Sequence, residues 1–252
     1  MIYLAPEITD FRPRIGYENL AVSVTGSSSA TGFPVTAVLN PMTYERWRPT
    51  VAPANMIIDL GEVVEIDYVA MLHSLQGATL SIYHRQGSSG EWTTIHHELL
   101  ITDNTPFMTV FEPVSARYIS IVINQIREIN VVYMGKVLTM ETCITGNHSP
   151  GALSRNTEIR PNRSEGGQFL GRSVTRKGYE TSYSFDFLPA QWVRDKLDPF
   201  VVAATKRPFF ISAEVDRFPE EVLYGWCNRD IRPSYMGVLD YMSSSFQIEA
   251  VE

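Results

Sequence analysis

The fold class is decided by residues 56–123, which begin with MIIDLG at 56–61 and end with RYISIVI at 117–123. Three more short apolar runs lie between them: YVAML at 68–72, TLSIY at 79–83 and EWTTI at 91–95. Turn residues separate the runs at about the eight- to twelve-residue spacing typical of sandwich strands. In the last run, successive side chains point to opposite faces of a strand. The stretch therefore predicts a sandwich of antiparallel strands.

The composition is that of an ordinary globular protein. The chain has 252 residues, of which 44% are hydrophobic and 19% are charged, and its net charge is −7. These values exclude a disordered acidic chain and a membrane-embedded protein, and no run reaches the ~20 apolar residues that a spanning helix needs. An acidic chain is also a poor general binder of nucleic acid, because phosphate neutralisation requires a basic surface. We expect no nucleic-acid partner and no membrane insertion.

A stretch of different character covers residues 145–178. It is rich in glycine and proline and lacks apolar periodicity, which predicts a loop or linker. Its charge is basic, because Glu158 and Glu165 are outnumbered by Arg155, Arg160, Arg163, Arg172, Arg176 and Lys177. One interpretation is a solvated linker. The other is an assembly arm that orders only against an acidic partner surface, since arginine suits fixed pairing with carboxylates.

Residues 179–252 predict a β-rich domain carrying one helix. The run at 181–187 alternates polar and aromatic residues, which predicts a strand with Tyr183, Phe185 and Phe187 buried. A helix is expected near 189–205, where one apolar stripe contains Val193, Leu197, Phe200 and Ala204. Further strands are expected at 209–213, 221–226 and 245–251. The chain is thus expected to be mainly β, with domains at 1–144 and 179–252 joined by residues 145–178.

No motif in the chain predicts catalysis, a metal site or a cofactor. His96 and His97 are adjacent, so on a strand they point to opposite faces and cannot hold one metal together. The other histidines lack a partner at ligand spacing, and no Gly-x-Ser-x-Gly elbow is present. Cys143 and Cys227 are far apart in the sequence, and we expect two buried free thiols. Dispersed carboxylates leave a glycan hydrolase open as a lesser hypothesis.

Six short segments in order resemble the discoidin, or galactose-binding-like, jelly-roll family. They are AVLN at 37–40, YERWRP at 44–49, MIIDLG at 56–61, LSIY at 80–83, WTTI at 92–95 and ARYISI at 116–121. The resemblance covers roughly residues 15–140. It implies an N-terminal jelly-roll β-sandwich whose rim loops at one end bind sugars, phospholipid head groups or proteins without catalysis.

The resemblance also suggests where a ligand would bind. The rim loops would include residues 44–49, the turn after His73 and the hairpin at 87–90. A sugar site needs an aromatic plate and polar groups for hydroxyls. The candidate ligand-binding residues are therefore Tyr44, Arg48, His73 and Arg85. The positions matching Trp47, Trp92, Arg117 and Tyr118 are usually structural in this family, so we expect them to pack rather than bind.

The second half resembles small β-rich modules of tailed-bacteriophage virion proteins. The residues that carry this likeness are SFDFL at 184–188, Trp192, KRPFF at 206–210, PEEVLYGW at 219–226 and SSSFQIEA at 243–250. The modules are those of distal-tail and minor-tail proteins, where a β-barrel with one helix joins a ring at the tail tip. This resemblance implies a non-enzymatic virion protein, made in the host cytoplasm, that forms a homo-oligomeric ring and contacts other tail proteins and host-surface carbohydrate. The alternative is a free-standing carbohydrate-binding module protein.

Overall fold

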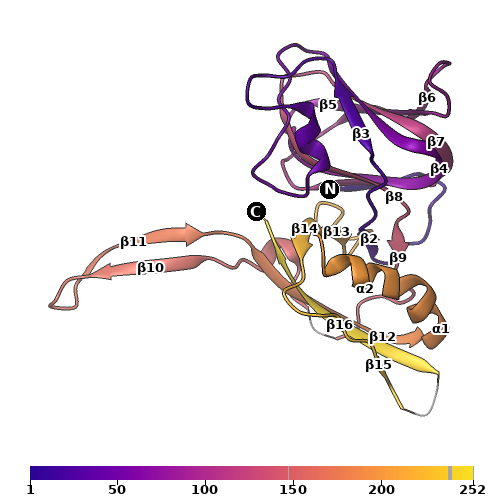
Figure 1. The fold of residues 1–252 in the computed structure, drawn as a ribbon. Helices are drawn as coiled ribbons and strands as arrows, with labels where there is room; N and C mark the ends of the chain where they lie inside the picture. The colour runs from indigo at the N-terminus through magenta and orange to yellow at the C-terminus, as the bar shows by residue number, and fades with distance from the viewer. Residues whose placement is uncertain (147, 238–239, 252) are drawn as a thin grey trace. The chain divides into compact units, whose positions relative to one another are not determined.

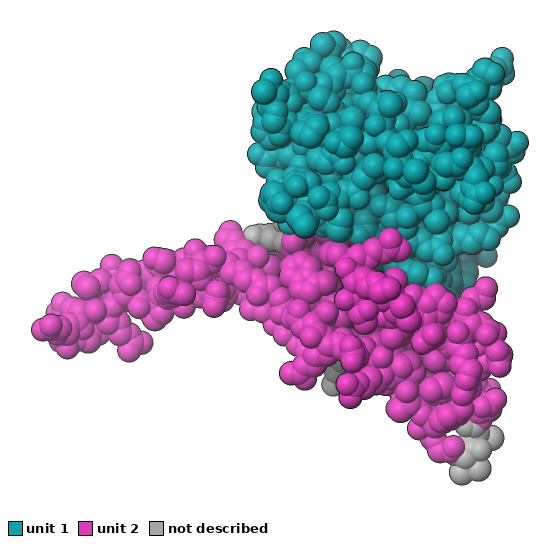
Figure 2. Space-filling view, in the orientation of Figure 1, with its two compact units in different colours: residues 1–139, 209–222 teal, residues 140–208, 223–252 magenta. Residues whose placement is uncertain are grey.

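The computed structural model describes residues 1–146, 148–237 and 240–251 (Figure 1). They form two compact units, distinguished by colour in Figure 2. Unit 1 contains residues 1–139 and 209–222, and unit 2 contains residues 140–208 and 223–252. No helix in the described ranges is both long enough and apolar enough to cross a membrane.

Unit 1 contains the jelly-roll sandwich that the sequence predicts. Its strands, among the described residues, are β1 (Ile2–Leu4), β3 (Ser23–Gly26), β4 (Ala54–Ser74), β5 (Thr79–Arg85), β6 (Thr93–Leu100), β7 (Phe107–Ile123) and β8 (Glu128–Gly135). A short 3-10 turn at Val35–Leu39 lies in the loop between β3 and β4. The fold class expected from the sequence, mainly β with an N-terminal sandwich, is confirmed.

Two long strands connect both layers of the sandwich. The runs at 56–60 and 68–72, which look like separate strands in the sequence, are both part of β4. The first half of β4 pairs with β3 and with the end of β7, from Ala54 opposite Ile123 to Asp59 opposite Tyr118. After a register shift, its second half pairs with β8 and with the start of β7. Gly61, at φ 83°, lies at this shift, where a left-handed backbone favours glycine.

The sandwich core is formed by alternating side chains of these strands. In the first half of β4 every second residue is fully or almost fully buried. In the last part of β7, Ile119, Ile121 and Ile123 are fully buried, as the sequence pattern predicts, whereas residues 107–111 of the same strand are buried without alternation. The main contributors are Met56, Ile58, Val69, Met71, Leu80, Ile82, Ile119, Ile121 and Val132. Burying such apolar surface is the main term that stabilises the unit.

The sandwich has two ends that carry different loops. At the first end, which we call the β3–β4 end, the backbone of Trp47 pairs with that of Ile129, and Thr79 N–H donates to Asn124 Oδ1 at 2.8 Å. At the opposite end, Arg85 is the last residue of β5 and lies across from Tyr118. The hairpin at 87–90 therefore lies at the end opposite residues 44–49. The expectation that both loops share one rim is wrong, because β5 runs the length of the sandwich between them.

Three short strands explain why residues 209–222 belong to unit 1. β13 (Phe209–Ser212) pairs antiparallel with β2 (Arg14–Gly16), which in turn pairs with β9 (Leu138–Thr139). The Phe210 ring packs edge-on against Tyr133 of β8, with ring centroids 5.5 Å apart. The domain expected at 179–252 includes residues 209–222. In the structure they belong to unit 1 instead, because β13 pairs with β2 near the N-terminus.

Unit 2 is a small sheet with one helix. Its strands are β10 (Glu158–Arg163), β11 (Phe169–Arg176), β12 (Tyr179–Pro189), β14 (Val222–Trp226), β15 (Ser234–Tyr235) and β16 (Tyr241–Ala250), and a 3-10 turn spans Gly151–Leu153. β16 pairs antiparallel with β12, β14 and β15. The helix consists of α1 (Ala190–Trp192), a π turn at Val193–Leu197 and α2 (Asp198–Ala204).

The predicted helix stripe forms part of the core of unit 2. Val193, Leu197, Phe200 and Ala204 are all buried. The Phe200 ring packs edge-on against Phe246 of β16 at a centroid distance of 5.8 Å. The helix near 189–205 is therefore confirmed, and its apolar face holds it to the sheet.

Residues 158–176 are not the loop that their composition suggests. β10 and β11 pair antiparallel, from Glu158 opposite Arg176 to Arg163 opposite Phe169, with two register shifts. Figure 1 shows this hairpin extending away from the other strands of unit 2. Both strands are exposed along their length, so no face needs apolar residues. For that reason the sequence carries no strand periodicity here, although the segment is a hairpin.

Phe187 also departs from its predicted place. Tyr183 and Phe185 are buried on β12 as expected, but Phe187 is 61% exposed. The pairing with β16 shifts between Phe185 and Leu188, and Phe187 adopts a φ of 59°. This bulge adds a residue to β12, so that Leu188 takes the buried position in place of Phe187. A strict alternation cannot reveal such an insertion.

Candidate functional site

A pocket of about 500 Å3 opens in the loop between β3 and β4. We call it the β3–β4 pocket. Its lining residues come from the Gly32 turn, the 3-10 turn and the segment before Trp47, and they are Gly32, Phe33, Pro34, Thr36, Ala37, Asn40, Tyr44, Glu45 and Arg46. The pocket lies at the β3–β4 end of the sandwich, where rim loops were expected to bind.

Trp47 holds the wall of this pocket in place. Its side chain is fully buried, and its indole N–H donates to Ser28 O at 2.9 Å and to Ser29 Oγ at 3.2 Å. Its backbone exchanges two hydrogen bonds with Ile129, at 2.8 and 3.1 Å. Asn130 Nδ2 adds a bond to Thr43 O at 2.9 Å. The packing role expected for Trp47 is confirmed, and through these bonds it fixes the neighbouring loop.

The pocket presents aromatic surface next to charge. The Tyr44 side chain is 72% exposed, so its aromatic ring is accessible to a ligand. The guanidinium of Arg46 lies 5.1 Å from the centre of the Phe33 ring, within cation–π range. Arg46 Nε also pairs with Glu128 Oε2 at 3.2 Å. An exposed ring and a held guanidinium therefore border one hollow.

Polar groups of the pocket are oriented by one another. Asn40 Nδ2 donates to Glu45 Oε2 at 2.8 Å. The charge of Glu45, and a hydrogen bond between the two side chains, raise the pKa of Tyr44 above its usual value. Amide, carboxylate and phenol groups lie together in the pocket, which suits a polyhydroxylated ligand.

A second, smaller hollow adjoins the same ion-pair network. It has a volume of about 240 Å3 and is lined by Arg48, Ser74, Ile126, Arg127 and Glu128. Arg48 is exposed, and its Nη1 lies 3.8 Å from Glu128 Oε1. Glu128 thus bridges Arg46 of the first pocket and Arg48 of the second. The structure places two predicted residues, Tyr44 and Arg48, at this end of the sandwich.

His73 is not available to a ligand. It is only 4% exposed and packs against Phe107, with ring centroids 6.4 Å apart. Its Nδ1 accepts a hydrogen bond from the backbone N–H of Leu75 at 3.2 Å. Burial lowers the pKa of His73 to about 3, so the ring is neutral at pH 7. The expectation that His73 contacts a sugar is wrong, because the end of β4 points this side chain into the core.

Arg85 lies at the opposite end of the sandwich from Tyr44. Its guanidinium stacks 4.3 Å from the Trp92 ring centre and 5.2 Å from that of Tyr118. Arg117 also lies over Tyr118 at 5.2 Å, and its Nε pairs with Asp59 Oδ1 at 3.0 Å. The four predicted ligand residues therefore do not converge. In this stack, Trp92, Arg117 and Tyr118 contact other side chains of the sandwich, which agrees with the packing role expected for them.

Most residues of the β3–β4 pocket were missed in the sequence. Phe33, Asn40, Glu45 and Arg46 of this pocket, and Glu128 of the adjoining hollow, carry no motif that marks them as ligand contacts. One signal was present, because Asn40, Glu45 and Arg46 belong to the segments that carry the family resemblance. Glu128 lies far along the chain and reaches the site only through β8, so no local pattern could have indicated it.

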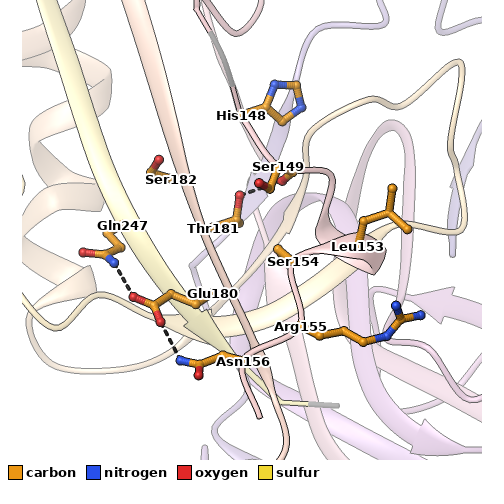
Figure 3. Close-up of a pocket in the computed structure, with 10 residues that line it drawn as sticks. All are labelled: His148, Ser149, Leu153, Ser154, Arg155, Asn156, Glu180, Thr181, Ser182 and Gln247. Carbon is orange, nitrogen blue, oxygen red and sulfur yellow. Dashed lines mark hydrogen bonds between the residues drawn. The ribbon is translucent and has the colours of Figure 1, made fainter.

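Unit 2 contains a separate polar groove, shown in Figure 3. Its volume is about 630 Å3, and its walls come from residues 148–156 and from β12 and β16. Glu180 accepts hydrogen bonds from the amides of Asn156 and Gln247, as the dashed lines show. Thr181 Oγ1 donates to Ser149 O at 2.7 Å. These polar groups bond to one another, and among the described lining residues the imidazole of His148 is the single ring.

The arginines predicted to form an assembly interface fall into two groups. Arg160, Arg163 and Arg172 lie on the β10–β11 hairpin. Arg155 lines the groove of Figure 3, and Arg176 pairs with Glu249 at the base of the hairpin. The pKa of Arg176 is raised by that partner. The hairpin thus carries four of the five predicted residues, with Arg176 at its base.

The thiols differ from expectation. Cys143 is exposed, and Cys227 is only partly buried, with its pKa raised to about 11 by burial. Both are free, and the expectation of two buried thiols is wrong for Cys143 because it follows the end of β9 on the surface. Within the described ranges, no three His, Cys, Asp or Glu side chains gather where they could hold a metal ion.

Comparison with known proteins identifies a domain type in unit 1. Residues 23–134 match the model of the F5/8 type C domain, which agrees with the discoidin-like resemblance of the first half. No curated protein matches the sequence.

Several solved structures are similar over the same half of the chain. A pectin-binding carbohydrate-binding module is 17% identical, with a TM-score of 0.42, covering 46% of this chain and 91% of that chain. A chitosan-binding module of a chitosanase/glucanase from Paenibacillus sp. IK-5 is 19% identical, with a TM-score of 0.40, covering 46% and 98%. A GH29 fucosidase of Ruminococcus gnavus in complex with fucose is 20% identical, with a TM-score of 0.42, covering 49% and 27%.

Proposed function

We propose that unit 1 is a carbohydrate-binding module that holds its ligand in the β3–β4 pocket. One observation carries this proposal: an exposed aromatic side chain, Tyr44, borders a pocket whose other walls present an amide, a carboxylate and a guanidinium. The match of residues 23–134 to the F5/8 type C domain supports a binding role for this part of the chain.

The chemistry of the pocket suits a sugar. The apolar face of a pyranose ring stacks on an aromatic ring such as that of Tyr44. Asn40, Glu45 and Arg46 offer donors and acceptors for hydroxyl groups. The volume of about 500 Å3 lies within the ~300–1,000 Å3 usual for small-molecule sites. The adjoining hollow at Arg48 gives room for a further ring of an oligosaccharide.

We propose binding without turnover. The described part of the pocket contains one carboxylate, Glu45, and that group is already bonded to Asn40. A glycosidase needs two carboxylates about 5–10 Å apart across the scissile bond. Incubation with polysaccharides and detection of reducing ends tests this point: no release of sugar supports a binding module, and release contradicts it.

A glycan array followed by calorimetry tests the proposed site. We expect glycan hits with wild-type protein and about a tenfold loss of affinity in Tyr44→Ala, since losing the stacking contact together with its buried apolar area costs about 1.4 kcal/mol. Tyr235→Ala, at an exposed tyrosine of unit 2, is the matched control and should bind normally. Equal affinity in both variants would remove the β3–β4 pocket from the proposal.

We propose as a second candidate that the chain is a subunit of a tailed-phage virion, with unit 2 as the assembly part. The observation that favours it is the exposed, arginine-bearing β10–β11 hairpin, which has no covering surface within the described part of unit 2. In such a particle, a homo-oligomeric ring would contact other tail proteins, and unit 1 would bind host-surface glycans. Electron microscopy of phage particles with antibodies to the chain tests it. Antibody labelling of the tails supports the role. Unlabelled particles, together with a purified protein that stays monomeric, contradict it.

A further inference from the structure

The β10–β11 hairpin exposes apolar side chains that a solitary hairpin should avoid. Phe169 is 69% exposed and Leu170 65%, and Ile159 and Val174 are exposed across from each other. A two-stranded hairpin alone is marginally stable in water, and exposed apolar patches of this kind mark interaction surfaces. The hairpin therefore has the character of a surface that is covered by a partner.

The charge of the hairpin points to an acidic partner. Residues 155–177 carry six basic and two acidic side chains, whereas the whole chain has a net charge of −7. Arg160, Arg163 and Arg172 form no ion pair within the described residues. A second copy of this acidic chain is thus an electrostatically suitable partner.

A matching surface lies at the other end of β12. Four exposed side chains form what we call the β12 patch: Phe187, Tyr235, Met236 and Tyr241. The rings of Phe187 and Tyr241 lie edge to face at 6.4 Å, and the N–H of Phe187 lies 3.2 Å from the Met236 sulfur. These contacts join three of the four residues of the patch.

The backbone is strained in order to present this patch. Phe187 has a φ of 59°, a left-handed conformation that bulky residues rarely adopt. Without the bulge, period-two alternation would turn Phe187 toward the core. Strain that exposes an aromatic ring is better explained by a binding role than by the stability of unit 2.

An acidic group lies beside the β12 patch. Asp240 is exposed and directly precedes Tyr241 in the chain, and its backbone O accepts a hydrogen bond from Ala190 N–H at 2.9 Å. An arginine of an incoming hairpin would meet the Asp240 carboxylate there.

We propose that the β10–β11 hairpin of one copy docks on the β12 patch of a second copy. The hairpin joins the start of β12 near Tyr179, and the patch surrounds its end at Phe187. The two surfaces thus lie at opposite ends of one strand, and the hairpin points away from β15 (Figure 1). Contacts of this head-to-tail kind close into rings or extend into filaments. The inference rests on the assembly role proposed above and names its two surfaces.

Complementation between two variants tests this contact. Arg160→Glu with Arg172→Glu disables the hairpin, and Phe187→Ser with Tyr241→Ser disables the patch. Sedimentation velocity should show wild-type species above the 28.4 kDa monomer that grow with concentration. Each double variant should lower the association constant at least about tenfold, which corresponds to 1.4 kcal/mol. An equimolar mixture of the two should form a dimer and stop there, because each copy retains one working surface.

Matched controls separate the possible results. Lys206→Glu with Arg229→Glu changes the same charge elsewhere on unit 2, and Val202→Ser changes an exposed apolar residue of α2. Both should associate like wild type. Circular dichroism establishes that each variant is folded.

Each outcome decides something different. Wild-type oligomers that both double variants leave intact would overturn the proposed contact but keep an assembly role. A hairpin variant that dissociates while the patch variant stays associated would show hairpin-to-hairpin pairing instead. Two variants that both dissociate but fail to complement each other would also overturn the proposed contact. A wild-type protein that stays monomeric up to millimolar concentration would overturn both this contact and the assembly role.

Discussion

Asp67 provides a direct test of the packing of unit 1. Burial raises the pKa of its carboxyl group from 3.8 to about 6, and this effect exceeds the opposing hydrogen bond from Val137 N–H and the charge of Lys136. Glu18 and Glu65 raise the pKa further. The folded protein therefore keeps a proton on Asp67 at pH 5 that the unfolded chain releases.

The sign and size of the effect follow from this difference. Because the folded-state pKa of an acid is raised, its contribution to stability falls as the pH rises from about 4 to about 6. The difference between about 6 and 3.8 corresponds to about 3 kcal/mol. Residual solvent screening reduces the expected loss to about 2 kcal/mol. Asp67→Asn has no charge to bury and keeps an oxygen for Val137 N–H, so it avoids that loss.

Urea unfolding followed by tryptophan fluorescence between pH 4 and pH 8 measures the effect. We expect Asp67→Asn to be about 2 kcal/mol more stable than wild type at pH 7, and equal to it at pH 4. Glu62→Gln, at an exposed position of the same strand, is the control and should match wild type throughout. A variant that is less stable at pH 7, or equally stabilised at pH 4 and pH 7, would refute the reasoning.

Three further predictions concern packing and reactivity. Phe187→Gly should change the free energy of unfolding by less than about 1 kcal/mol, because glycine tolerates φ 59°, whereas Phe185→Gly should cost more than about 3 kcal/mol; urea titration distinguishes them. Trp47→Phe should lower the free energy of unfolding by about 1–3 kcal/mol in the same assay, because it removes the indole N–H that donates to Ser28 O at 2.9 Å. No loss of stability would contradict the anchoring role of Trp47. Cys143 should react with a disulfide reagent at pH 8 at least about tenfold faster than Cys227, whose raised pKa leaves less thiolate; mass spectrometry after timed quenching reads this, and equal rates would contradict it.

Much of the fold could be predicted because its signals are local. The alternation in residues 117–123 and the stripe from Val193 to Ala204 each report one buried face, and both faces are buried in the structure. The continuity of β4 could not be predicted, because Gly61 and the polar residues after it look like a turn. The β10–β11 hairpin is exposed on both faces, so it leaves no pattern at all.

The candidate site was harder to predict than the fold. Tyr44 and Arg48 were found because they lie in a segment with a family resemblance, and both are exposed at the expected end. His73 and Arg85 were chosen for their chemistry. In the structure His73 is buried against Phe107, and Arg85 stacks on Trp92 and Tyr118. The contacts with Phe107 and Tyr118 join strands that are distant in the sequence, so the sequence does not reveal them. Glu128 joins the site only through strand pairing, which a single sequence does not show.

The central claim is that a glycan binds unit 1 at the β3–β4 pocket. Backbone amide chemical-shift mapping by NMR, with an oligosaccharide selected on the glycan array, tests it most directly. We predict that the largest shifts cluster in residues 32–46 and extend to Arg48 and Glu128. Shifts centred on Arg85 and Trp92 at the opposite end, or confined to unit 2, would contradict the claim.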